Sequence, residues 1–186
     1  MVRSRSIALS SLGVALISGW LALPCFAKGT NTPSGSDQVS TLLLNAEAQA
    51  FQLRADADEL EGYSRSNASW QSHAEAIDRI REDVNKMGDI LNRLEQNRSK
   101  AAPWQQVAIS RVVPVARELA ANTTAAIDHL NRNPNRLNTP RYQEYLEAIV
   151  DSADNLSSTI KDAVDYGRTK QRLDRLAARL ELPEGK

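Results

Sequence analysis

Four stretches of this chain place apolar residues at alternating steps of three and four, the spacing of the buried face of a packed helix. These rows of apolar residues, called seams below, cover 39–60, 70–94, 109–130 and 142–163. Almost no segment alternates apolar and polar residues as a half-buried strand does. Because each seam needs another apolar surface to cover it, the pattern predicts an all-α protein in which four helices pack together.

Proline and capping residues divide the chain into the expected helices. Pro103 follows the turn after the second seam, and Asn138-Thr139-Pro140 combines a cap with proline at the first helical position. We expect helices over about 37–62, 69–99, 103–131 and 140–181, the third bending at Pro114 without a break. Short turns favour antiparallel neighbours, which predicts an up-down-up-down four-helix bundle over 37–182, with a long C-terminal helix and a tail at 183–186.

The chain begins with the three parts of a secretory signal peptide. Arg3 and Arg5 precede an uncharged apolar run at 7–23, and Cys25-Phe26-Ala27 provides a small-x-small cleavage site. We therefore expect a signal peptide over 1–27 that is cleaved after its last residue, followed by a flexible linker at 28–36. An uncleaved membrane anchor is the alternative, because the apolar run approaches the length that spans a bilayer.

The cysteine and charge content limits the possible functions of the mature chain. Lipid attachment to Cys25, the only cysteine, is disfavoured because Pro24 stands where a small residue belongs. Without that residue the mature chain has no disulfide and no thiolate metal site, so packing must stabilise it. Its 23 acidic residues slightly outnumber the basic ones once Arg3 and Arg5 are removed from the original 23. These features predict a periplasmic or secreted bacterial protein that binds no nucleic acid and spans no membrane after cleavage.

Two histidines and several aromatic residues are expected at one end of the bundle. In an antiparallel bundle His73, near the start of the second helix, shares a level with His129, Trp70 and Tyr142. One interpretation is a hydrogen-bonded plug that sets the helix register. Another is a small-ligand or haem carrier that uses this His/aromatic cluster. A metal site is the third, although a carboxylate pair at ligand spacing is missing.

No catalytic or cofactor motif accompanies this cluster. The chain contains no Glu-x-x-His, His-Glu-x-x-His, Cys-x-x-Cys-His or Gly-x-Ser-x-Gly sequence. Haem ligation by His and Met also fails, because Met87 lies about 21 Å from His73 along the same helix. We therefore expect a protein that is not an enzyme and holds no resident cofactor or metal.

The chain resembles a group of exported bacterial helical-bundle proteins that carry no assigned activity. The resemblance rests on four runs: Trp70-Gln71-Ser72-His73-Ala74, Asn85-Lys86-Met87-Gly88, Pro103-Trp104-Gln105-Gln106 and Ala121-Asn122-Thr123-Thr124-Ala125-Ala126-Ile127. It extends over residues 38–182. It implies an exported helical protein and transfers no functional residue.

The last helix is expected to be longer than its neighbours and to overhang the bundle. The overhang, Arg168 to Leu182, carries a narrow leucine stripe beside several arginines. Such a stripe suggests a second copy of the chain, an acidic partner or an anionic surface, and a solvated, frayed helix end is the alternative. We therefore expect a non-enzymatic role in protein interaction, structure or stress response.

Overall fold

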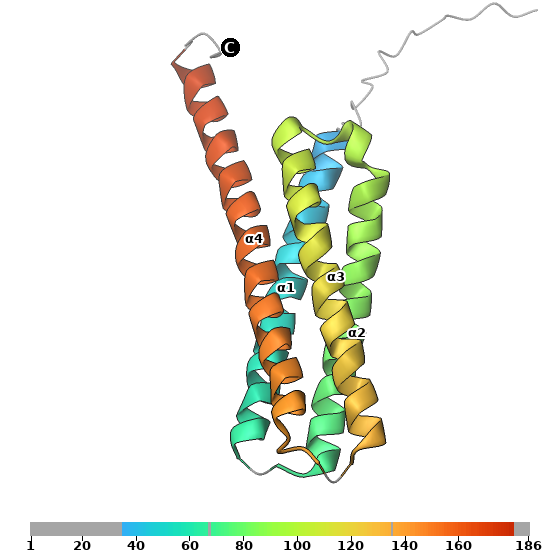
Figure 1. The fold of residues 1–186 in the computed structure, drawn as a ribbon. Coiled ribbons are helices and arrows are strands. Elements are labelled where there is room, and N and C mark those ends of the chain that lie inside the picture. Colours follow the sequence, from blue (N-terminus) through green and yellow to red (C-terminus); the bar gives the residue numbers. More distant parts are fainter. Residues whose placement is uncertain (1–34, 67, 135, 181–186) are drawn as a thin grey trace, which may run out of the picture. The chain divides into compact units, whose positions relative to one another are not determined.

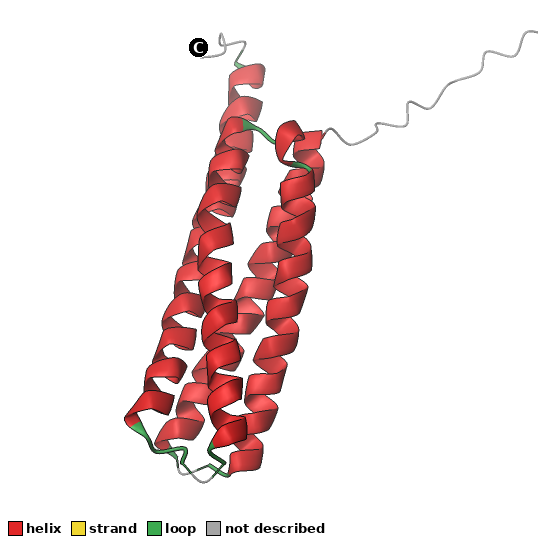
Figure 2. Cartoon of the chain, turned by 45° about the vertical axis from the view of Figure 1, so that its right-hand side comes forward, coloured by secondary structure: helices red, strands yellow, loops and turns green. Residues whose placement is uncertain are grey.

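The computed structural model describes residues 35–66, 68–134 and 136–180. They form four long helices, α1 (Gly35–Arg65), α2 (Trp70–Gln96), α3 (Pro103–Arg132) and α4 (Pro140–Arg179), with one turn of 3-10 helix, η1 (Arg98–Lys100), between α2 and α3. No strand occurs in the part of the chain that is described, as Figure 2 shows. The predicted all-α class is confirmed.

Consecutive helices run in opposite directions and pack side by side (Figure 1). Helix α1 contacts α2 and α4, and α3 contacts the same two helices, so that α1 and α3 occupy one diagonal of the bundle. This is the predicted up-down-up-down arrangement. It brings the end of α1, the start of α2, the end of α3 and the start of α4 to one end, which positions the candidate site.

Capping residues fix where the helices begin. The Ser69 hydroxyl accepts the backbone N–H of Ser72 at 3.2 Å and caps α2. Pro140 occupies the first turn of α4 as predicted, but the Thr139 hydroxyl donates to the Arg136 carbonyl at 3.1 Å and does not cap the helix. Helix α3 continues unbroken through Pro114.

Helix α1 begins at Gly35, two residues earlier than expected, so the predicted linker ends sooner. A contact with α3 accounts for this earlier start. The Gln105 side chain, which is buried, donates to the Ser36 carbonyl at 3.0 Å and to the Ser40 hydroxyl at 2.9 Å, and it accepts the Ala102 N–H at 2.8 Å. These bonds hold the first turn of α1 against the first turn of α3.

The predicted seams form the core. All seam residues of α1 are buried, and so are those of the other helices apart from Trp70, Val84, Ala116 and Ala163, which are half-buried. In α4 the core position falls one residue later, at Val164. The burial of one continuous apolar face per helix is what stabilises a bundle that has no disulfide among its described residues.

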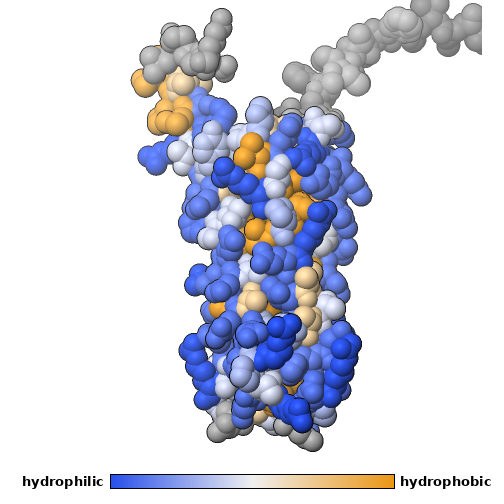
Figure 3. All heavy atoms as spheres, in the orientation of Figure 1, coloured by the Kyte–Doolittle hydropathy of each residue, from blue (hydrophilic) through white to orange (hydrophobic). Residues whose placement is uncertain are grey.

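Helix α4 extends beyond the other helices (Figure 1). Gly167 is its last buried residue, and every described residue from Arg168 onward is exposed except Ala177, which is half-buried. The predicted overhang is confirmed up to Leu180. Figure 3 shows apolar side chains at this end of α4.

Several predictions concern residues outside the described part of the chain. These are the signal peptide at 1–27, the linker up to residue 34, the last two residues of the expected overhang and the tail at 183–186. Among the described residues, no helix combines the length and the apolar character needed to cross a membrane.

Candidate functional site

The structure brings the predicted cluster together at one end of the bundle. Trp70 is the first residue of α2, His73 lies one turn later, His129 is in the last turn of α3, and Tyr142 is in the first turn of α4. Because the bundle is antiparallel, these turns share one level. The sequence therefore predicted the location of the cluster correctly.

Tyr142 is the centre of the cluster and is fully buried. Its hydroxyl lies 3.1 Å from Nδ1 of His73, which is also buried. Its ring stacks on His129, with ring centroids 5.4 Å apart and an interplanar angle of 20°. Tyr142 thus contacts both histidines, one through its hydroxyl and the other through its ring face.

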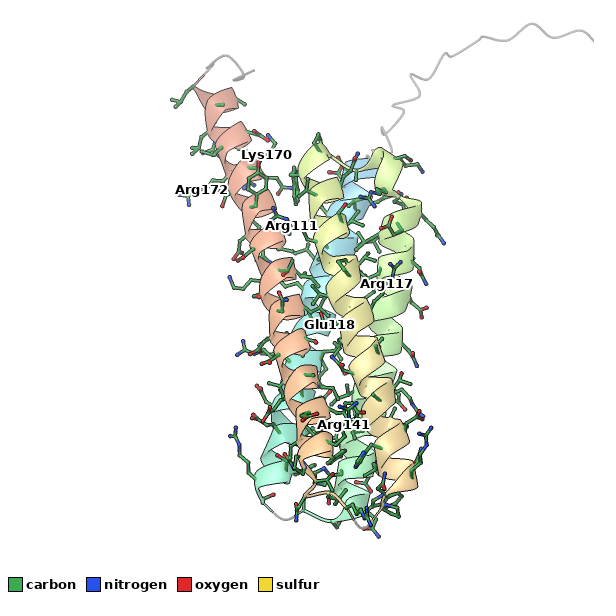
Figure 4. All side chains as sticks on the ribbon, viewed as in Figure 1. Arg111, Arg117, Glu118, Arg141, Lys170 and Arg172 are labelled. Carbon is green, nitrogen blue, oxygen red and sulfur yellow. The ribbon has the colours of Figure 1, made fainter. Side chains whose placement is uncertain are left out.

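Other polar atoms of the cluster have hydrogen-bond partners nearby. The Trp70 indole N–H donates to the Leu130 carbonyl at 3.4 Å, and the Thr139 hydroxyl lies 3.3 Å from Nε2 of His129. Arg141, labelled in Figure 4, donates to the Tyr145 hydroxyl at 2.9 Å, and its guanidinium lies 5.0 Å from the centroid of that ring. Trp70 is therefore bound to the end of α3 and does not point a free donor toward the histidines.

Burial favours the uncharged form of both central groups. It lowers the pKa of His73, and a hydrogen bond with the Tyr63 backbone opposes this effect only in part. Burial also raises the pKa of the Tyr142 hydroxyl. Neutral partners are what a hydrogen-bonded plug requires, since an uncompensated charge at this depth would destabilise the fold.

This geometry favours the plug over a ligand set. Tyr142 lies against both imidazoles, and the His73 nitrogen that faces it already has a partner. A cavity at this end is lined by Trp70 and loop residues 134 and 136–139, and by neither histidine. Among the described residues, no group of three or more His, Cys, Asp or Glu side chains is placed to hold a metal ion.

A second cluster, which the sequence analysis missed, lies between α1 and α2. Asp56 and Asp83 are both buried, and their carboxyl groups lie close enough for each to shift the pKa of the other. The Gln52 amide donates to Asp56 at 3.1 Å, and Lys86 pairs with Asp83 at 2.7 Å. Arg79 approaches Asp56 at 3.7 Å.

The two carboxyl groups have different proton affinities. Burial raises the pKa of Asp56, and the neighbouring Asp83 raises it further, against the effects of Gln52 and Arg79. Burial acts in the same direction on Asp83, but the hydrogen bond from Lys86, together with the effects of Asp56 and Gln49, outweighs it and lowers the pKa of Asp83. The two neighbouring carboxyl groups therefore differ in proton affinity, and Asp56 takes up a proton more readily than Asp83.

A sequence signal for this pair existed but was weak. Each aspartate directly precedes a seam residue, Ala57 or Val84, and therefore lies at the edge of the apolar face. Charged residues at such edges are ordinarily solvated. The two aspartates are buried here because α1 and α2 are rotated so that the edges of their apolar faces meet.

Comparison of the chain with protein family models, with curated proteins and with solved structures found no match in any of the three.

Proposed function

We propose that this chain is an exported bacterial helical bundle that performs no catalysis and acts through protein contacts made by the overhang of α4. The observation that carries the proposal is the row of exposed leucines on that overhang. Leu173 is 60% exposed, Leu176 43% and Leu180 66%. Exposed leucines that share one helix face are typical of a surface that another molecule covers.

The remaining support comes from the two clusters. In the His/aromatic cluster, His73 is hydrogen-bonded to Tyr142, which lies at its centre and is fully buried. The carboxyl pair of Asp56 and Asp83 is likewise buried between helices. A binding role on the surface therefore accounts for more of the structure than chemistry in the core.

The contact function can be tested in the bacterium that produces the protein. A photo-crosslinking amino acid at position 173 is compared with one at Phe51, which is at least as exposed but lies on α1, away from the overhang. We expect a discrete protein adduct from position 173 only. Equal adducts at the two positions, or no adduct at either, would contradict the proposal. A haem absorption band in the purified protein that disappears in His73→Ala would also contradict it.

Export needs a separate measurement. Cell fractionation followed by N-terminal sequencing is expected to find the protein in the periplasm, beginning at Lys28. A cytoplasmic chain that retains its first residues would refute this part of the proposal.

A further inference from the structure

The leucine stripe does not continue the core of α4 but lies on another face of the helix. The core positions of α4 end with Ile160, Val164 and Gly167. At the same steps of three and four, the next positions are Gln171, Asp174 and Ala178. Because successive residues turn by about 100° around a helix, Leu173, Leu176 and Leu180 face away from these positions. The stripe is therefore a separate apolar surface.

Tyr166 connects this stripe to a groove between α3 and α4. It precedes Leu173 by one heptad, is 55% exposed, and its ring centroid lies 5.5 Å from that of Trp104 on α3. The groove has a volume of about 670 Å³, and Val107, half exposed, forms part of its α3 wall. In Figure 3 apolar side chains gather along the line between these two helices. Groove and stripe together extend over about 38 Å of α4, from Asn155 to Leu180.

The charges around this surface are mostly basic and uncompensated. Arg111 lines the groove on α3, and Arg172, Arg175 and Arg179 belong to the overhang; Figure 4 labels the first two. Within the described residues none of these four arginines has an ion pair or hydrogen bond, whereas Lys170 pairs with Asp174 at 3.3 Å.

Arg172 and Arg179 lie one turn on either side of Leu176 and so border the stripe. Asp162 is the acidic residue of the groove lining, on the α4 wall. The basic residues therefore outnumber it on this surface.

We propose that this surface, the groove together with the stripe, binds an acidic amphipathic helix of another protein. The proposal deepens the proposed function by stating the chemistry of the partner. The partner's apolar face would cover Tyr166 and the leucines, and its carboxylates would pair with Arg111 and with the arginines that border the stripe.

Two other occupants fit the surface less well. If two copies of the chain paired through the overhang, Arg172 and Arg179 of both copies would lie along the same contact, where their like charges repel. A flat bilayer would reach the protruding leucines but not Ala108 and Val115, which are recessed in the groove. A helix fits between two helices, and about 25 residues of it would span the whole surface.

The test uses a designed helical peptide of about 25 residues with leucine at the a and d positions and glutamate at e and g. A twin peptide carries lysine in place of glutamate. Labelled peptides are titrated with the mature protein and followed by fluorescence anisotropy at low and high salt. We expect saturable binding of the acidic peptide, weakened by salt, and no binding of the twin.

Charge reversal identifies the surface that binds. Arg172→Glu combined with Arg179→Glu is expected to weaken binding of the acidic peptide at least tenfold and to create binding of the lysine twin. Arg117→Glu is the control, because Arg117, on α3, likewise has no ion pair among the described residues but lines the α2/α3 side, away from the proposed surface. The control should bind like the wild type.

Several outcomes would overturn the inference. They are equal binding of both peptides, no binding, an equal loss in the control, and a stable dimer in sedimentation. Binding to phosphatidylglycerol vesicles without binding to the acidic peptide would overturn it too. If none of the peptides binds while the crosslinked protein at position 173 persists, the proposed contact function stands and only the acidic helix is rejected.

Discussion

At the scale of single residues, the Tyr142 hydroxyl depends on His73 for its hydrogen bond. Leucine is an ordinary seam residue, so the sequence alone suggests that His73→Leu is tolerated. The structure changes this expectation, because the substitution leaves a fully buried hydroxyl unpaired. We predict that His73→Leu lowers the free energy of unfolding by about 1–3 kcal/mol, measured by chemical denaturation. The double variant His73→Leu/Tyr142→Phe should recover most of that loss, and an additive double variant would contradict the coupling.

The same histidine makes stability depend on pH. Its pKa is lower in the folded protein than the usual 6.5, so the unfolded chain binds the proton more readily. Stability that is present above pH 6.5 is therefore lost as the pH falls toward the folded pKa. We expect the thermal midpoint to drop between pH 7 and pH 5. This drop should be smaller in His73→Leu/Tyr142→Phe, and an identical pH profile would rule out His73 as its source.

Asp56 makes stability depend on pH in the opposite direction. Its pKa is raised in the folded state, so the folded protein binds the proton more readily and stability falls as the pH rises from 3.8 through the folded pKa. An asparagine amide carries no charge at any pH, whereas burial disfavours the charged form of Asp56. We predict that Asp56→Asn raises the free energy of unfolding at pH 7 by about 1 kcal/mol, whereas Asp83→Asn lowers it by a similar amount through loss of the Lys86 pair. Denaturant titrations that rank the two variants in reverse would refute the opposite pKa shifts of the two aspartates.

At the scale of the elements, α4 ends its contact with the bundle at a glycine. A Cβ atom at Gly167 would lie 2.6 Å from Cη2 of Trp104, so the two helices approach closely only without a side chain there. Gly88, in the middle of α2, has no atom within 4 Å of such a Cβ. Glycine therefore has a packing role in α4 that it lacks in α2.

These two glycines give opposite predictions. Gly167→Ala is expected to lower the free energy of unfolding by about 1–3 kcal/mol because the indole of Trp104 must move. Gly88→Ala is expected to raise it by about 0.5–1 kcal/mol, since alanine restricts the unfolded chain and favours the helix. Thermal melts of both variants provide the check. Stabilisation by alanine at both positions would show that α3 and α4 are less closely packed at this level.

At the scale of the whole molecule, the overhang is separate from the core that stabilises the fold. No described residue after Gly167 is buried, and Arg168 is tied to the bundle only through an exposed ion pair with Glu47 on α1 at 3.0 Å. We predict that a chain ending after Gly167 unfolds within about 0.5 kcal/mol of the full-length protein. Leu94→Ala, which empties a fully buried position, is the contrasting control and should lose about 2–5 kcal/mol. A large loss in the shortened chain would mean that the overhang supports the fold.

The four helices, the buried face of each, their antiparallel order and the end at which His73 meets Tyr142 could all be predicted from the sequence. These follow from periodicity and turn length, which are properties of one helix and its immediate neighbour in the chain. Three features became visible only in the folded chain: Asp56 is buried beside Asp83, Trp104 covers Gly167, and Arg111 lines a groove with no ion-pair partner among the described residues. These pairings depend on the rotation and axial shift of one helix against another. Packing of all four seams at once sets both quantities, so no single stretch of sequence contains them.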